Sequence, residues 1–448
     1  MRRIGLALPT DRACPDAVAA LGDEAAYAAR HFGTEVRLLI LDTSGPDALA
    51  ANRTAADALR PAPGVTVHHL DERRQRAFLR TVLGLSGVED PGRLLGLMLP
   101  DGVSYGACTN RVFLLAAALG CTSVHRRDSD GRYQRHEAET VFPVHHELAF
   151  LGRRAADVAA SGALTRTRLD PAAADRPVAL VGGSFIGEMS VDLGQMHRAD
   201  PALYEEVVGL SLPADCPEIW RRKLVGEAFR GGGTTPFTRD HTTLMAVSPA
   251  RVDMCNISLT DAVYERVPLP PATDTIGSDY FLSHLVHDAG LPGVLHNRHI
   301  VNHYTGERRT DQGFLAYQLR FARFLLATHH LNAVYARLTA AGGDLLDAEG
   351  HLRAPLVAGY VRDSVALDVT ANEERLDVLD RSYRALGDRY TAVADALAAR
   401  RRELLDGAAA DMADFALLID AWQPLVRASR SPEGVRAANA AREAAPPR

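Results

Sequence analysis

The sequence is poor in the patterns that mark secreted, membrane-spanning or disulfide-stapled proteins. Its five cysteines are scattered and form no C-x-x-C pair, so neither a disulfide framework nor a zinc knuckle is indicated. No apolar run approaches the ~18 residues of a membrane span, and the N-terminus lacks a signal-peptide pattern. We therefore expect a cytoplasmic protein that does not span a membrane.

Basic segments are also scarce. Lys223 is the only lysine among 50 lysine and arginine residues, and the chain has no basic tail. The formal net charge is −6, and the pI is near 6.3. Proteins that bind nucleic acid usually present a basic patch or a basic tail. We therefore do not expect nucleic acid as a partner.

The first third of the chain alternates short apolar runs with helical patterns. It contains three predicted strands and three predicted helices, which alternate as strands at 4–8, 36–41 and 65–70 and helices at 16–32, 47–59 and 72–83. This alternation is typical of an α/β fold with a doubly wound, mostly parallel sheet. Strand-like runs continue with irregular spacing to about residue 303, and helical periodicity follows from residue 313.

An Asp-Ser-Asp triplet carries the strongest chemical signal. Residues 110–119 have the length and apolar density of a helix, Gly120 ends it, and residues 122–125 read as a buried strand. Asp128 and Asp130 come directly behind that strand. Ligands of open α/β sheets bind at the carboxyl ends of the strands. Two carboxylates there suggest a divalent cation held against a nucleotide diphosphate.

This central segment resembles that of GT-A glycosyltransferases, in which a helix with an Asn-Arg or Arg-Asn pair precedes a strand and an Asp-x-Asp metal motif. The pair here is Asn110-Arg111. Residues 4–12 resemble the family's first strand with its Pro-Thr exit. Residues 36–44 resemble its second strand, which ends in an aspartate, here Asp42.

Two later segments extend the resemblance in the expected order. Residues 277–282 (GSDYFL) look like the start of the family's catalytic helix, and residues 299–304 (HIVNHY) look like the segment with its last metal-ligating histidine. The family often has Glu-Asp at the first of these places, whereas Ser278 precedes Asp279 here. The assignment of the base is therefore less firmly supported than that of the metal ligands.

The resemblance implies a metal-dependent glycosyltransferase that moves a sugar from a nucleotide-diphosphate donor to a small-molecule, saccharide or peptide acceptor. Asp130 would bind Mn2+ or Mg2+, Asp128 would contact the ribose or the metal, and His303 would be the third protein ligand. Asp279 would be the catalytic base of an inverting enzyme, with Asp274 in reserve. The residues expected to bind the donor are Pro9, Thr10, Arg12, Asp42, Asn110, Arg111 and Asp128.

The resemblance also suggests a domain organisation. Residues 1–312 would form a GT-A-like catalytic domain with a nucleotide-binding half at 1–150 and an acceptor-side half at 151–312. A helical C-terminal domain would follow at 313–430, and its apolar faces must cover either the catalytic domain or the second subunit of a homodimer. The polar segment 431–448 is expected to be disordered. The alanine- and arginine-rich composition suggests a bacterial enzyme of specialised metabolism.

Each candidate also has a purely structural interpretation. Asp128 and Asp130 would then belong to a solvated turn, and Asp279 would simply favour the N-terminus of a helix. His299 and His303 have the spacing of a helical zinc pair, but no HExxH pattern accompanies them, and they would otherwise be surface or core histidines.

Two other function classes stay open. A nucleotidyltransferase usually has a glycine-rich loop and a lysine after its first strand, whereas residues 9–15 (PTDRACP) contain neither. A catalytically silent scaffold, which binds or dimerises through its C-terminal helices, would share the fold, and fold alone does not distinguish it from an enzyme.

Overall fold

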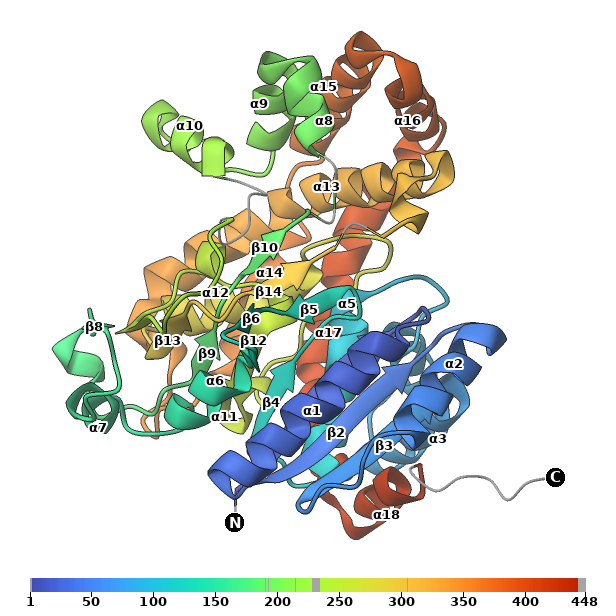
Figure 1. Ribbon diagram of the computed structural model, residues 1–448. Helices are drawn as coiled ribbons and strands as arrows, with labels where there is room; N and C mark the ends of the chain where they lie inside the picture. The colour runs from blue at the N-terminus through green and yellow to red at the C-terminus, as the bar shows by residue number, and fades with distance from the viewer. Residues whose placement is uncertain are drawn as a thin grey trace.

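The computed structural model describes residues 2–189, 191, 193–213, 215–227, 234–303 and 305–441. Its centre is a nine-stranded sheet with the strand order β3-β2-β1-β4-β12-β9-β13-β11-β8 (Figure 1). The strands are β1 (Arg3–Thr10), β2 (Glu35–Asp42), β3 (Val65–Asp71), β4 (Ser123–Arg126), β8 (Arg166–Thr167), β9 (Leu180–Gly182), β11 (Thr242–Met245), β12 (Ile257–Thr260) and β13 (Gly293–His296).

The sheet is mostly parallel, as the sequence predicts. β1 pairs in parallel with β2 and β4, and β2 does so with β3. β12 runs antiparallel to both β4 and β9, so β9 has the direction of β4, and β13 follows β9. β11 opposes β13, and β8 runs parallel to β11. Strands from both halves of the predicted catalytic domain therefore belong to one sheet.

Helices cover both faces of this sheet, and strands such as β1 are therefore buried on both sides. In β1, Leu6 and Leu8 pack with the helices α1 (Pro15–Phe32) and α2 (Pro46–Asp57), whereas Ala7 belongs to the core on the opposite face. That second core includes α3 (Glu72–Ser86), α4 (Pro91–Met98) and α5 (Tyr105–Ala118). Such two-sided burial is typical of parallel sheets in α/β proteins.

The C-terminal helices pack against the same chain. α13 (Asp311–Ala341), α14 (Ala354–Ser364), α17 (Arg401–Arg430) and α18 (Pro432–Ala440) contribute to the core on the α5 side of the sheet. Trp422 of α17 is fully buried and donates a hydrogen bond of 2.9 Å to the carbonyl oxygen of Tyr264. These apolar faces therefore cover the sheet domain, which is the first of the two predicted arrangements.

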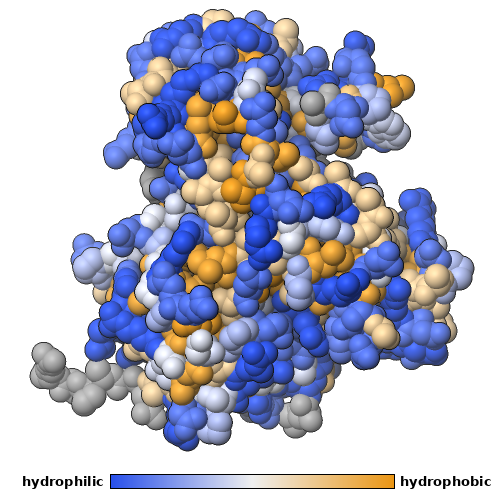
Figure 2. Space-filling view, turned by 180° about the vertical axis from the view of Figure 1, so that it is seen from behind, coloured by the Kyte–Doolittle hydropathy of each residue, from blue (hydrophilic) through white to orange (hydrophobic). Residues whose placement is uncertain are grey.

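A second hydrophobic core lies beyond the sheet, in the upper part of Figure 1. It joins α8 (Leu193–Ala199), α9 (Pro201–Gly209), α10 (Glu218–Glu227), α15 (Thr370–Leu386) and α16 (Asp388–Ala399) with the first half of α13. Figure 2 shows the molecule from behind, where its outline narrows between this helical part and the sheet-bearing part. Both α13 and α17 contribute to both cores and so connect them.

Smaller elements complete the described part. The short helices are α6 (Val144–Phe150), α7 (Ala155–Ala160), α11 (Asp261–Tyr264) and α12 (Phe281–Asp288). There are two small sheets. In one, β14 (Ile300–Asn302) lies between β10 (Phe185–Gly187) and β5 (Gly131–Tyr133), and in the other, β6 (Arg135–His136) pairs with β7 (Glu139–Thr140). Among the described helices, none has the length and apolar composition needed to cross a membrane.

The prediction of a disordered tail from residue 431 is wrong for its first ten residues. The Ser431 side chain caps α18 by accepting a hydrogen bond of 3.1 Å from the Gly434 amide, and Pro432 occupies the first turn. Ala438 is fully buried in the core that contains α3. A capped helix with one buried face is therefore ordered despite its polar composition, and residues 442–448 lie outside the described part.

Candidate active site

Several of the predicted site residues lie where the parallel strands end. β1 ends at Thr10, β4 at Arg126 and β9 at Gly182, all on one edge of the sheet. The antiparallel β12 begins there, because Ile257 pairs with both Arg126 and Gly182. Segments that leave β1, β4 and β9, together with the segment that enters β12, therefore surround one place.

Four aspartates meet at this edge, and we call Asp128, Asp130, Asp253 and Asp279 the carboxylate cluster. Arg126, at the end of β4, connects two of them: its Nη1 lies 2.5 Å from Asp279 Oδ2, and its Nη2 lies 3.0 Å from Asp128 Oδ1. Arg126 is 3% exposed, and its Nε is buried without a hydrogen-bond partner among the described residues. The structure thus brings together Asp128 and Asp279, which are 151 residues apart in the sequence.

Burial and neighbouring charges both shift the pKa of Asp128. Burial raises the pKa of Asp128 to about 7; Arg126 opposes the shift, and the negative charges of Asp130, Asp253 and Asp279 add to it. A carboxyl group with such a pKa among like charges is typical of a functional site rather than of a solvated turn.

Asp130 takes part in a different ion pair. Its Oδ2 lies 2.8 Å from Nη2 of Arg308, and both side chains are at least nine-tenths buried. Its backbone carbonyl accepts a hydrogen bond of 3.2 Å from the backbone amide of His303. The loop after β4 and the segment after β14 are thus adjacent, as the prediction of a shared site requires, but the observed contact of His303 is through its backbone.

The predicted metal ligands do not form a metal site in this arrangement. Asp128 and Asp130 each direct one carboxylate oxygen to an arginine. Within the described ranges, no three His, Cys, Asp or Glu side chains are grouped so that they could hold a metal ion. The roles of Asp128, Asp130 and His303 as ligands of Mn2+ or Mg2+ therefore stay predictions.

The two candidates for the catalytic base lie in different places. Asp279 belongs to the 3-10 turn η4 (Ser278–Tyr280) that precedes α12, and it is 5% exposed. Asp253 is close by, because its Oδ2 accepts a hydrogen bond of 2.5 Å from the Tyr280 hydroxyl. Asp274 lies instead against another loop, where it receives a backbone hydrogen bond from Val103. Only Asp279 is part of the carboxylate cluster.

The Asn110-Arg111 pair makes contacts inside the protein. The Asn110 amide exchanges two hydrogen bonds of 2.8 Å with the backbone of Leu269. Arg111 donates to the Gln75 side chain at 2.8 Å and to the Met98 carbonyl oxygen at 2.6 Å. Both side chains hold neighbouring segments against α5, and their predicted contact with a donor stays a prediction.

Asp42 also forms its hydrogen bonds with other residues of the protein. It is 1% exposed, and its carboxylate accepts hydrogen bonds from Asn52, His69 and the Ser44 amide. Burial raises the pKa of Asp42, but these hydrogen bonds outweigh it, and the net shift is downward. Pro9 and Thr10 end β1 and are buried at the same edge. Of the predicted donor residues outside the cluster, Arg12 alone is partly exposed, at 23%.

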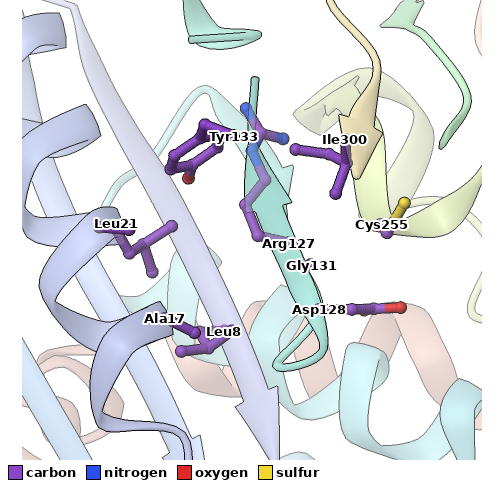
Figure 3. Close-up of a pocket in the computed structure, with 10 residues that line it drawn as sticks. Leu8, Ala17, Leu21, Arg127, Asp128, Gly131, Tyr133, Cys255 and Ile300 are labelled. Carbon is purple, nitrogen blue, oxygen red and sulfur yellow. The ribbon is translucent and has the colours of Figure 1, made fainter. Parts of the chain in front are cut away.

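A narrow pocket lies beside the carboxylate cluster (Figure 3). Its walls come from β1 and α1 on one side and from Cys255 and Ile300 on the other, with Gly131 between them. The Asp128 carboxylate points away from α1 in this view. The volume is about 10 Å³, which is room for a single water molecule. This pocket is therefore too small to be the donor site itself.

Three residues of the site are not among those predicted from the sequence: Asp253 and Arg308, which no pattern indicated, and Arg126, for which a surface ion pair was the favoured interpretation. Asp253 and Arg308 belong to no local pattern, because Asp253 enters the site from the loop before β12 and Arg308 from the turn before α13. The basic Arg126-Arg127 pair was a visible signal, but the sequence alone does not separate an arginine of the site from one of the core.

The chain was compared with curated sequences, with solved structures and with family models. No curated protein sequence matches the chain. Among solved structures, a mannosyltransferase from Pyrobaculum calidifontis in complex with GDP-Man and Mn2+ is 13% identical, with 93% of this chain and 87% of that chain covered. Its TM-score of 0.33 is too low to establish a common fold. The family of unknown function DUF6271 matches residues 2–438, and the chain therefore belongs to this family.

Proposed function

We propose that this protein is a glycosyltransferase that moves a sugar from a nucleotide-diphosphate donor to an acceptor hydroxyl group. The observation that carries the proposal is the carboxylate cluster at the carboxyl edge of the sheet. It joins the Asp128-Ser-Asp130 triplet behind β4 to Asp279 through Arg126, which is 3% exposed. Open α/β sheets bind their ligands at this edge.

The residues suit the two ends of such a transfer. In the proposed reaction, the bond between the sugar's anomeric carbon and the diphosphate oxygen breaks, and its electron pair leaves with the diphosphate. The acceptor oxygen forms the new bond, and its proton passes to Asp279. Arg126 orients Asp279 with an ion pair of 2.5 Å and leaves Oδ1 of Asp279 outside that contact.

The test is calorimetric titration of UDP, GDP, dTDP and CDP into the full chain, with and without Mn2+. One nucleotide should bind. Asp130→Ala removes the buried partner of Arg308, so the Tm of this variant is measured first, and at a temperature where it stays folded its binding should be weaker by about 10-fold or more. This loss is typical when a charge-assisted contact is removed. Asp101→Ala, at an exposed position, is the matched control and should bind normally.

Two results would contradict the proposal. If none of the four nucleotides binds with or without Mn2+, the donor assignment fails and a binding scaffold becomes the better interpretation. If a nucleotide binds equally well to Asp130→Ala and to the native chain, the binding site lies elsewhere.

A further inference from the structure

We propose that the diphosphate of the donor is held by an arginine cluster, Arg12, Arg308 and Arg320 around Tyr317, and that nucleotide binding does not require a metal ion. This inference rests on the proposed function and deepens it. It also accounts for the ion-paired state of the carboxylates that the sequence suggested as metal ligands.

The three arginines come from three separate elements. Arg12 follows β1, Arg308 belongs to the 3-10 turn η5 (Glu307–Arg309), and Arg320 lies on α13. The guanidinium carbons of Arg308 and Arg320 lie 4.7 and 4.9 Å from the centre of the Tyr317 ring. Tyr317 is 4% exposed and so fixes both cations beside the carboxyl edge of the sheet.

Among the described residues, two carboxylates form ion pairs with members of this cluster. Asp11 pairs with Arg12 at 3.3 Å, and Asp130 pairs with Arg308 at 2.8 Å. No carboxylate lies within ion-pair distance of Arg320 in the described part of the chain. Arg12 lies near enough to Arg308 for their positive charges to repel each other. An anion would relieve the repulsion between these arginines.

Unused hydrogen-bonding atoms lie in the same place. Arg12 Nη1 and Thr305 Oγ1 are buried and have no hydrogen-bond partner among the described residues. Thr305 begins the turn of Arg308, because its carbonyl oxygen accepts from the Arg308 amide at 3.1 Å. Buried polar atoms without protein partners are uncommon in native proteins, and these two are available to a ligand or to water. Two donors from two elements fit a ligand rich in acceptor oxygens.

Arginine is chemically suited to the leaving diphosphate. Its planar guanidinium group can donate two parallel hydrogen bonds to one phosphate, and it stays charged at any pH at which the protein is folded. As the glycosidic bond breaks, negative charge grows on the diphosphate, and fixed cations stabilise it there. Asp130 then has a positioning role, because it holds Arg308 in its buried place.

The experiment titrates UDP, GDP, dTDP and CDP into the full chain in EDTA and again in Mn2+. The nucleotide that binds should do so in EDTA with an affinity within about 3-fold of that in Mn2+, because the arginine cluster rather than a cation carries the contact. Arg308→Gln and Arg12→Gln should each weaken binding about 10- to 100-fold, the loss typical of a charge-assisted hydrogen bond. Arg309→Gln is the control, since Arg309 is the exposed neighbour at 58%.

The outcomes separate this inference from the proposed function. Binding that EDTA abolishes and Mn2+ restores overturns the arginine cluster and leaves the glycosyltransferase proposal standing. The absence of binding in both buffers overturns both. If Arg308→Gln fails to fold, Arg12→Gln decides, because Arg12 is partly exposed, and normal binding by that variant overturns the inference. Arg308→Lys keeps the charge without the planar fork and should recover only part of the affinity.

Discussion

Two charged clusters share the end of β4, and they differ in how completely their hydrogen bonds are satisfied. Arg127 uses all five of its N–H groups, with contacts of 2.7–3.1 Å to Glu24, Glu147 and the Arg126 carbonyl oxygen. Arg126, its neighbour in the chain, holds Asp128 and Asp279 but leaves Nε without a partner among the described residues. The first cluster is closed, and the second is open to a ligand.

The closed cluster, which we call the Arg127 network, includes His125 and Tyr133 as well. The His125 ring forms hydrogen bonds with the Glu147 carboxylate at 2.8 Å and with the Ser123 hydroxyl at 2.9 Å. The Tyr133 hydroxyl donates a hydrogen bond of 2.5 Å to Glu24. Glu24 lies on α1 and Glu147 on α6, so the network fastens both helices to β4. A fully satisfied buried network rigidifies its surroundings. It therefore positions the loop that carries Asp128 and Asp130.

The largest effect is expected when the closed cluster is broken. Arg127→Leu leaves two buried glutamates without their cation, and breaking such a pair costs about 3–5 kcal/mol. We expect this loss in the free energy of unfolding, measured by urea denaturation. Arg132→Leu changes an exposed arginine of the adjacent strand β5 and should leave the denaturation curve unchanged. Equal stability of the two variants would show that the Arg127 network is not what holds β4.

Acid should reveal the same network. Burial opposes ionisation of Glu147, but Arg127 and His125 outweigh it and lower the pKa of Glu147 from 4.5 to about 2. Because the folded pKa lies below the unfolded one, the stabilisation is present above pH 4.5 and is lost as the pH falls toward 2, an effect on the order of a few kcal/mol. Burial lowers the pKa of His125, so His125 takes up a proton more readily in the unfolded chain. Its protonation therefore also favours unfolding as the pH falls.

Urea denaturation between pH 6 and about 2.5 checks this expectation. Glu147→Gln should flatten the acid limb of the stability curve, whereas Glu137→Gln, at a side chain that is 85% exposed, should keep it. An unchanged acid limb in Glu147→Gln would mean that another group controls acid unfolding.

Changes in the open cluster are expected to lower activity. Asp279→Asn is expected to lower sugar transfer about 100-fold, or about 2.7 kcal/mol, because the proton acceptor is lost, while nucleotide binding stays intact. Steady-state kinetics and calorimetry on the same preparation measure the two quantities. Asp274→Asn, the reserve candidate, is the matched control and should transfer normally. Equal loss of binding and transfer in Asp279→Asn would indicate a structural role.

An exposed ion pair provides the smallest effect. Arg154 lies 2.7 Å from Asp157 and 2.8 Å from Asp175, but all three side chains are at least half exposed. Solvent and salt screen such pairs. Arg154→Ala should therefore leave the Tm unchanged within experimental scatter. A clear decrease would show that short distance alone, without burial, is enough to stabilise this protein.

The strands and helices of the first half could be predicted because their signals are local. Alternation of apolar runs with helical patterns located β1 to β3 and α1 to α3, and the observed boundaries differ from the predicted ones by only a few residues. The position of Asp128 and Asp130 behind β4 followed from the same pattern. The helical character of the C-terminal region is confirmed for the same reason.

Local patterns did not reveal what each polar residue contacts. Asn110 and Arg111 belong to the resembling motif, yet in the structure they bond to Leu269, Gln75 and Met98. The helix α18 was missed because its stability comes from the burial of Ala438 in a core whose other residues include those of α3, hundreds of positions earlier in the sequence. Neither set of contacts can be predicted from the residues adjacent in the sequence.

The sequence by itself determined the sheet-and-helix order and placed two carboxylates at a strand end, since periodicity and chain direction are properties of neighbouring residues. Only the tertiary structure decided that Arg126 joins Asp128 to Asp279, that Arg308 pairs with Asp130, and that Arg127 is part of the core. The physical reason is burial. An ion pair gains its strength where water is excluded, and which residues lose water together depends on how distant segments pack.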